Sequence, residues 1–168
     1  MAFGRAARRE EPPENRLDLS ERLAPYGDQD IDVETLSRPS APRSMADVRL
    51  VIVDDLPAIR TMMTLAVSLF DGVTLVGEAE GAVDAVEVCR RVEPDAILLD
   101  VDMPDVDGVQ AIPMLRKAAP RAKIAMYSND DTSRLPSMAA GADAFFLKLT
   151  TTPGAVLREI AALVAGGR

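Results

Sequence analysis

The stretch AILLDVDMPDVDG, residues 96–108, joins a short apolar run to a loop that is crowded with aspartates. An apolar run followed by Asp100 is typical of a strand that is buried on both faces and presents a carboxylate at its end. Two other apolar runs also end in ionisable residues, which are Asp54, Asp55 and Lys148. The carboxyl ends of parallel strands share one edge of a sheet, where ligands bind, so these side chains are predicted to meet. Burying three carboxylates together is costly unless cations offset their charge, and the sequence therefore predicts a Mg²⁺ site beside a reactive aspartate.

The rest of the chain from Ala46 onward repeats the same pattern, because apolar runs alternate with segments of helical periodicity. This alternation is typical of βα units, and the continuous apolar runs indicate strands that are covered on both faces. The predicted fold class is α/β, with a doubly wound five-stranded parallel sheet. The predicted strands are Arg49–Val53, Thr74–Ala79, Asp95–Leu99, Lys123–Tyr127 and Ala144–Leu147.

Three of the predicted helices are regular. The first has Pro57 near its start, and its apolar residues at spacings of three and four are Ile59, Met62, Met63, Ala66 and Leu69. The second covers Ala82–Arg91. The last begins with Thr152 as its N-cap and Pro153 at the first helical position.

Two predicted helices are less regular because they contain proline. The third includes Pro113, which must lie in the first turn or kink the helix. The fourth, within residues 131–140, includes Pro136 and is predicted to be short or irregular.

The composition divides the chain of 168 residues into two parts. Residues 1–45 are rich in proline and charge and poor in large apolar groups, so they are predicted to form a disordered N-terminal extension. Residues 46–168 are predicted to form a single folded domain. The formal net charge of −8 argues against nucleic acid as a direct partner, because phosphate backbones bind to basic surfaces.

The absence of histidine and the presence of a single cysteine limit the reactions that this chain can support. The chain has no histidine, which excludes Ser/His/Asp hydrolysis, zinc sites with histidine ligands and phosphohistidine chemistry on the chain itself. If a phosphoryl group is carried here, a carboxylate must carry it. Cys89 is the single cysteine, and neither a signal peptide nor a long apolar segment is present. We therefore expect a cytoplasmic protein without membrane insertion.

Residues 100–108, DVDMPDVDG, closely resemble the phosphoacceptor loop of response-regulator receiver domains. Further similarities to that family are Asp54-Asp55, Arg60 in the following helix, the triplet Gly141-Ala142-Asp143 and Lys148. The resemblance covers residues 47–165 and implies a flavodoxin-like sheet with the strand order 2-1-3-4-5. It also implies a two-component signalling protein and not an enzyme, although a receiver can catalyse its own phosphorylation and dephosphorylation.

The resemblance assigns roles to the residues at the predicted sheet edge. Asp100 is the implied phosphoacceptor, because a carboxylate can take a phosphoryl group in one in-line transfer. The implied Mg²⁺ ligands are Asp55, Asp100 and the backbone carbonyl of Asp102, with Asp54 acting mainly through a coordinated water. Lys148 is expected to pair with Asp100 before transfer and with the phosphoryl oxygens afterwards.

The same resemblance implies a conformational switch. Ser128 matches the hydroxyl that moves to the phosphoryl group, and Phe145 matches the aromatic residue that responds to this movement. Asp102 and Asp130 match the two variable positions that tune how long the phosphoryl group lasts. Some receivers dimerise through the face of the fourth helix, fifth strand and fifth helix, which leaves homodimer formation open.

The leading hypothesis is a stand-alone receiver. It would accept a phosphoryl group on Asp100 from a histidine kinase or phosphotransfer protein, with Mg²⁺, and signal through a conformational change to a protein partner. No helix-turn-helix segment follows the predicted last helix in this sequence, so direct control of transcription is not expected unless the chain is a domain of a longer regulator, with Gly166-Gly167-Arg168 as the start of a linker.

Two alternatives remain open. A degenerate receiver that binds partners independently of phosphorylation is favoured by Asn129, which is larger than the residue usual there, and by the irregular fourth helix. A phosphatase of the haloacid-dehalogenase type is suggested by Asp100-Val101-Asp102, with Asp102 as the acid/base. Pro104 and the place of this motif in the third strand depart from that second pattern.

Overall fold

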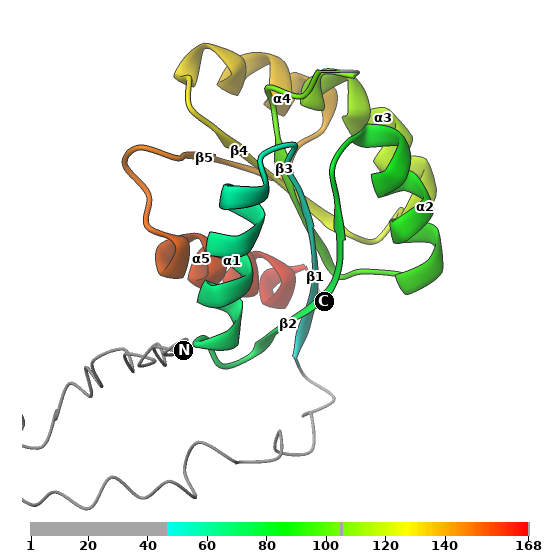
Figure 1. The fold of residues 1–168 in the computed structure, drawn as a ribbon. Coiled ribbons are helices and arrows are strands. Elements are labelled where there is room, and N and C mark those ends of the chain that lie inside the picture. The colour runs from blue at the N-terminus through cyan, green and yellow to red at the C-terminus, as the bar shows by residue number, and fades with distance from the viewer. Residues whose placement is uncertain (1–46, 105, 168) are drawn as a thin grey trace, which may run out of the picture. The chain divides into compact units, whose positions relative to one another are not determined.

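Figure 1 shows the fold in a computed structural model, which describes residues 47–104 and 106–167. Five parallel strands form one sheet in the order β2-β1-β3-β4-β5, which confirms the predicted doubly wound, flavodoxin-like fold. The strands are β1 Val48–Val53, β2 Val73–Ala79, β3 Ala96–Asp100, β4 Lys123–Ser128 and β5 Ala144–Leu147. The helices are α1 Pro57–Ser68, α2 Ala82–Val92, α3 Gly108–Ala118, the 3₁₀ helix η2 Asp131–Ser133, α4 Arg134–Ala140 and α5 Pro153–Gly166. The predicted disorder of residues 1–45 falls outside the described residues.

Helices cover both faces of the sheet. Helices α1 and α5 lie on one face, and α2, α3 and α4 lie on the other (Figure 1). Strand β3 serves both cores, because Ile97 and Leu99 pack toward α2 and α3 while Leu98 packs toward α1 and α5. A strand with two buried faces has no need of polar residues, which explains its continuous apolar run.

Two strands extend one residue beyond their predicted ends. Asp100 is the last residue of β3 and pairs with Tyr127 of β4, and Ser128 is the last residue of β4 and pairs with β5. Both candidate site residues therefore belong to the sheet, and their backbones are held by its hydrogen bonds. Strand β3 begins one residue later than predicted, at Ala96, and the Asp95 carboxylate just before it accepts a hydrogen bond from the Arg49 amide at 3.0 Å.

The apolar spacing in α1 identified its buried face only in part, because Met63 is buried and Ile59 and Ala66 pack against the core, but the other two residues do not. Met63 and Val67 are buried, whereas Met62 is 38% exposed and Leu69 is 80% exposed. Leu69 is the C-cap, so the helical period no longer governs the direction of its side chain. Helix α1 thus has an apolar stripe that faces outward in the described part of the chain.

The two proline-containing helices accommodate the proline residue in different ways. Pro113 lies inside α3, beyond the first turn, where the absence of an N–H removes one backbone hydrogen bond to Val109. Pro136 lies in the first turn of α4, where no intrahelical N–H bond is needed. Helix α4 has 7 residues and is entered through η2, as the prediction of a short or irregular helix requires.

Helix α5 begins as predicted. The Thr152 side chain accepts a hydrogen bond from the Ala155 amide at 3.3 Å, and Pro153 is the first helical residue. Within residues 47–104 and 106–167, none of the helices has both the length and the apolar character needed to cross a bilayer.

Candidate functional site

Asp100 stands at the centre of the sheet edge and is almost fully buried, with 2% of its surface exposed. Its carboxylate accepts a hydrogen bond from the Val101 amide at 2.8 Å, which fixes one oxygen. The loop that follows is closed by a hydrogen bond of 2.9 Å from the Gly108 amide to the Val101 carbonyl. A Cβ atom on Gly108 would lie 1.9 Å from the Asp100 carbonyl oxygen, so only glycine fits at this point.

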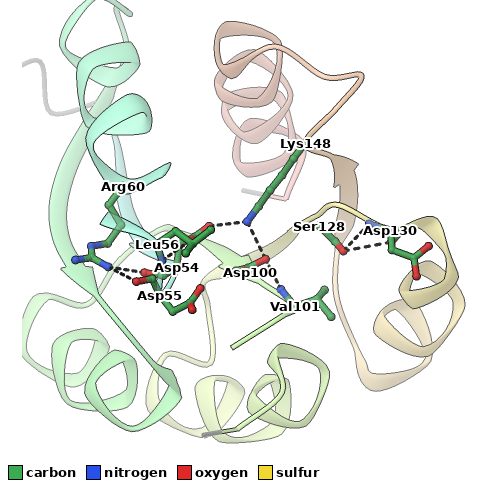
Figure 2. A network of polar contacts seen from close by, with 9 residues as sticks. All are labelled: Asp54, Asp55, Leu56, Arg60, Asp100, Val101, Ser128, Asp130 and Lys148. Carbon is green, nitrogen blue, oxygen red and sulfur yellow. Dashed lines mark hydrogen bonds and ion pairs between the residues drawn. The ribbon is translucent and has the colours of Figure 1, made fainter. Parts of the chain in front are cut away.

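Lys148 links two carboxylates at the same edge (Figure 2). Its Nζ atom lies 2.7 Å from Asp54 Oδ2 and 2.9 Å from Asp100 Oδ1. The Lys148 backbone is fixed as well, because its amide donates to the Ser128 carbonyl at 2.8 Å. The ammonium also lies 5.6 Å from the centroid of the Tyr127 ring, close enough for a cation–π interaction.

Burial and charge act against each other in this group. Burial raises the pKa of Asp100, and the Lys148 ammonium only partly offsets this effect. Burial alone would lower the pKa of Lys148, but hydrogen bonds to Asp54 and Asp100 outweigh it and raise the pKa above its usual value. Lys148 is therefore the permanent positive charge of the site near neutral pH.

The three aspartates also form a group that suits a metal ion. One carboxylate oxygen from each of Asp54, Asp55 and Asp100 lies within 4.8 Å of the others. Asp55 Oδ1 is buried and has no hydrogen-bond partner among the residues that the structure describes. A buried carboxylate oxygen without a donor is costly, and a hard, oxygen-binding dication such as Mg²⁺ would satisfy it. The donor set therefore fits the predicted ion.

Hydrogen bonds at the start of α1 hold this acidic pair in place. Asp54 Oδ1 accepts from the Leu56 amide at 2.9 Å, and Arg60 Nη1 donates to the carbonyls of Asp54 at 2.7 Å and Asp55 at 3.3 Å. The N-cap of α1 is Leu56, which makes no side-chain cap. The carboxylates of Asp54 and Asp55 thus remain directed to the site and do not cap the helix (Figure 2).

Asp102 differs from Asp54, Asp55 and Asp100 because its side chain is exposed, in the loop after β3. It lies two residues after Asp100, at the same edge of the sheet. The predicted role of its backbone carbonyl as a Mg²⁺ ligand stays a prediction.

Ser128 is fully buried, but its hydroxyl points to Asp130 and not to Asp100 (Figure 2). The hydroxyl accepts a hydrogen bond from the Asp130 amide at 3.1 Å and lies 3.2 Å from the Asp130 carbonyl, to which it donates. Phe145 is 7% exposed and packs on the α2 and α3 side of the sheet. The buried ring is thus combined with a Ser128 hydroxyl that is turned away from Asp100, and the switch role of both residues stays a prediction.

A groove of about 420 Å³ lies beside the lysine, between α1 and the loop that connects β5 to α5. Its lining includes Met62, Tyr127, Asn129, Lys148 and Leu149. Leu149 is 83% exposed and Asn129 is also exposed, so an approaching molecule would meet both. Asn129 and Lys148 both line this groove.

Two residues of the site escaped the sequence analysis. Tyr127 supports Lys148, and the one available hint was an aromatic residue just before Ser128 in an aliphatic strand. Arg134 lies with its guanidinium carbon 4.7 Å from the centroid of the Phe145 ring. No sequence pattern indicates this second contact, because it depends on how the short loop after β4 closes.

Among curated proteins, the chain is similar to several response regulators. The nitrate/nitrite response regulator protein NarL of Escherichia coli (strain K12) is 31% identical over 101 residues, which are 59% of this chain and 47% of that protein. The response regulator GacA of Pseudomonas aeruginosa is 30% identical over 115 residues, which are 67% of this chain and 51% of that protein. The match therefore spans only about half the length of these relatives.

Solved structures agree with this similarity. The signal receiver domain of the putative response regulator NarL from Mycobacterium tuberculosis has a TM-score of 0.65 and 30% identity, covering 71% of this chain and 98% of that one. A CheY-like receiver domain protein from Methanospirillum hungatei is similar in fold, with a TM-score of 0.63 at 23% identity over 72% of this chain and 96% of that one. The family model for the response regulator receiver domain matches residues 50–158, which is more than half of the chain. The chain therefore belongs to the family of response-regulator receiver domains.

Proposed function

We propose that this chain is a phosphoacceptor that takes a phosphoryl group on Asp100. The observation that carries the proposal is the pairing of Lys148 with Asp54 and Asp100, beside the buried, unpartnered oxygen of Asp55. If Lys148 only balanced charge, one carboxylate partner would be enough. The three carboxylates carry more negative charge than Lys148 can neutralise, so the site requires a second cation. Lys148 can then exchange one of its partners for another anionic group.

The transfer is a displacement at phosphorus. A carboxylate oxygen of Asp100 forms a P–O bond while the P–N bond of a phosphohistidine breaks, and the imidazole leaves with a proton from solvent. The sequence contains no histidine, so the donor is another protein, a histidine kinase or a phosphotransfer protein. After transfer, Asp100 no longer carries its free carboxylate charge, and Lys148 pairs with the phosphoryl oxygens.

The acidic residues have a separate task. Asp54, Asp55 and Asp100, with the carbonyl of Asp102, would hold Mg²⁺, which when bound neutralises part of the phosphoryl charge. Arg60 keeps Asp54 and Asp55 in position through their backbone carbonyls. We place the exchange in the cytoplasm and the output in binding to a protein partner or to a second copy of the chain.

The names of some relatives describe activities that we do not transfer to this chain. The protein-glutamate methylesterase/protein-glutamine glutaminase of Maricaulis maris is 37% identical over 90 residues, but those residues are 22% of that protein. A named activity of a protein more than four times as long as the match belongs to that whole protein. We propose for the matched region a signalling role and not an enzymatic one.

A second candidate is a receiver that binds its partner independently of phosphorylation. The observation in its favour is the Ser128 hydroxyl, which is engaged by Asp130 and directed away from Asp100. In this case partner affinity would be the same for the wild type and Asp100→Asn, with or without a phosphodonor.

The test is the intact mass of the protein after incubation with phosphoramidate and Mg²⁺. We expect one added phosphoryl group on the wild type and on Asp102→Asn, and none on Asp100→Asn or after chelation of the metal. The absence of an adduct on the folded wild type would overturn the proposal. Turnover of a phosphomonoester that is lost in Asp102→Asn would favour a phosphatase instead.

A further inference from the structure

A series of contacts connects the acceptor site to Phe145. The first of these contacts joins Ser128 to the loop after β4. The Ser128 hydroxyl both accepts from the Asp130 amide at 3.1 Å and donates to the Asp130 carbonyl, 3.2 Å away. A hydroxyl has one proton to donate, so Ser128 cannot keep its bond to the Asp130 carbonyl and also donate to a phosphoryl group. Movement of this hydroxyl toward Asp100 must therefore release the backbone at Asp130.

The second link holds the loop itself. The Asp130 carboxylate accepts from the Thr132 amide at 3.0 Å and from the Thr132 hydroxyl. These bonds lower the pKa of Asp130, so the carboxylate stays charged and keeps the turn closed near neutral pH. The next residue, Asp131, accepts a hydrogen bond from Arg134 Nε at 2.7 Å. A change in the backbone at Asp130 is thereby carried to Arg134 through its neighbour.

The third link joins Arg134 to the aromatic residue. The guanidinium carbon lies 4.7 Å from the centroid of the Phe145 ring, and Nη1 donates to the Phe145 carbonyl at 3.4 Å. Phe145 is 7% exposed, while the Arg134 side chain is 43% exposed. The guanidinium thus lies over the ring from the solvent side and also holds the β5 backbone.

Helix α4 begins at Arg134 and contains a polar group without a hydrogen-bond partner in this arrangement. The Ser137 hydroxyl is fully buried and has no partner in the described part of the chain. A buried hydroxyl without a partner favours any other packing that supplies one. Helix α4 therefore has a physical reason to adopt a second position.

We propose that Arg134 is the positioning residue that transmits the movement of the Ser128 hydroxyl to Phe145. The inference rests on the proposed phosphorylation of Asp100, because that event is what draws the hydroxyl away from Asp130. When the loop opens, Asp131 no longer holds the guanidinium in its present place, and the cover over the Phe145 ring changes. Arg134 acts through these contacts and does not touch the acceptor.

The experiment uses the full chain with Mg²⁺ and beryllofluoride, a phosphoryl mimic that binds to the acceptor carboxylate. Binding is followed by the ¹⁹F signal of the bound mimic, and the switch by the aromatic ring resonances of Phe145. In the wild type we expect the mimic to bind and the ring resonances to shift. In Arg134→Ala and in Asp131→Asn we expect the mimic to bind and the ring shift to fall by about threefold or more.

The controls separate coupling from folding and from the acceptor chemistry. Arg121→Ala removes the same charge from an exposed residue before β4, at the opposite edge of the sheet, and should leave the ring shift unchanged. Asp131→Asn changes only an exposed residue at the start of η2, so it remains informative if Arg134→Ala does not fold. If the mimic binds to both Arg134→Ala and Asp131→Asn and the Phe145 ring resonances shift as in the wild type, the role of Arg134 is overturned but the proposed function is not. Absence of bound mimic in the wild type would overturn the proposed function and this inference with it.

Discussion

At the scale of single residues, Lys148 carries the charge balance of the site. Its ammonium is 6% exposed and is shared between Asp54 and Asp100, which are themselves 3% and 2% exposed. Removing one member of a buried ion pair leaves the partner charge without compensation, which is more costly than the pair is favourable. Two carboxylates would lose their partner together here.

Lys148→Ala is therefore expected to lower the free energy of unfolding by about 3–5 kcal/mol in metal-free buffer near neutral pH. It should also abolish the phosphoryl adduct. Urea unfolding measures the first effect and intact mass the second. Lys117→Ala, at an exposed position on α3, is the matched control and should change stability by less than about 0.5 kcal/mol. Equal stability of the two variants would contradict the charge balance described here.

Asp143 is one residue through which the stability of the fold depends on pH. Burial alone would raise the pKa of Asp143, but hydrogen bonds from the Ile124 amide, at 2.9 Å, and from Arg116 outweigh it and lower the pKa. A carboxylate whose pKa is lower in the folded state stabilises the fold above its unfolded pKa, and this stabilisation is lost as the pH falls through the folded pKa. Asp143 thus contributes at neutral pH and not in acid.

Asp143→Asn is expected to lower the free energy of unfolding by about 1–3 kcal/mol at neutral pH, because Arg116 and the Ile124 amide lose a charged acceptor. The deficit relative to the wild type should shrink as the pH falls from about 4, the usual pKa of an aspartate, through the lower folded pKa of Asp143, where the wild-type carboxylate becomes protonated as well. Urea unfolding of both proteins across this range is the measurement. A deficit that is the same at both ends of the range would show that charge on Asp143 does not stabilise the fold.

At the scale of elements, the connection between β3 and α3 fixes the position of Asp100, the proposed acceptor. Gly108 begins α3 and touches the backbone of Asp100, so the helix and the acceptor share one close contact. Gly108→Ala is expected to destabilise the fold by about 1–3 kcal/mol and to reduce the rate of phosphorylation, because the loop must move to admit the methyl group. Thermal unfolding and the time course of the adduct measure these effects.

Gly154→Ala is the matched control, because a Cβ atom at this position in the first turn of α5 meets nothing within 4 Å. It should be neutral or slightly stabilising, since alanine favours helix more than glycine does. If Gly108→Ala and Gly154→Ala behaved alike, the close contact at Asp100 would not be what positions the acceptor.

The elements also show how far the sequence predicts this structure. Strands β1 and β3 were predicted to within a residue or two because both faces are buried, which leaves long apolar runs with ionisable ends. The buried face of α1 was predicted less well, since Leu69 follows the same spacing as Met63 but lies beyond the helix end. An apolar pattern identifies a helix more securely than it identifies the side that the fold will cover.

The contacts of the site, too, could be predicted from the sequence only in part. Asp54, Asp100 and Lys148 could be predicted to meet, because strand ends in a parallel sheet share an edge. The bond from Ser128 to Asp130 and the contact of Arg134 with Phe145 could not be predicted, because both depend on how a short loop closes. Local loop geometry leaves no periodic trace in the sequence.

At the scale of the whole molecule, we expect the proposed Mg²⁺ binding to be linked to folding. A Mg²⁺ ion that binds only the folded state stabilises it by mass action, so each tenfold rise in concentration above the dissociation constant should add about 1.4 kcal/mol. The unfolding free energy at constant ionic strength measures this effect. Constant ionic strength matters because a chain with net charge −8 also responds to general screening.

Asp55 and Asp84 line one pocket, together with Glu80 and Pro104, and so provide the comparison. Asp55→Asn is expected to remove the dependence on Mg²⁺, whereas Asp84→Asn, in the first turn of α2, should retain it. The same loss in both variants would mean that the ion responds to the general acidity of the surface. A dependence that survives Asp55→Asn alone would contradict the assignment of Asp55 as a ligand.

The most direct test of Asp100 as phosphoacceptor is chemical trapping of the phosphorylated residue. Borohydride reduces an acyl phosphate to an alcohol with release of phosphate, and so converts a phosphorylated aspartate to homoserine. After reaction with phosphoramidate and Mg²⁺, reduction and peptide mapping, we predict homoserine at position 100 and unmodified aspartate at Asp54, Asp55 and Asp102. Homoserine at any of these other positions, or at none while an adduct is present, would contradict the central role of Asp100.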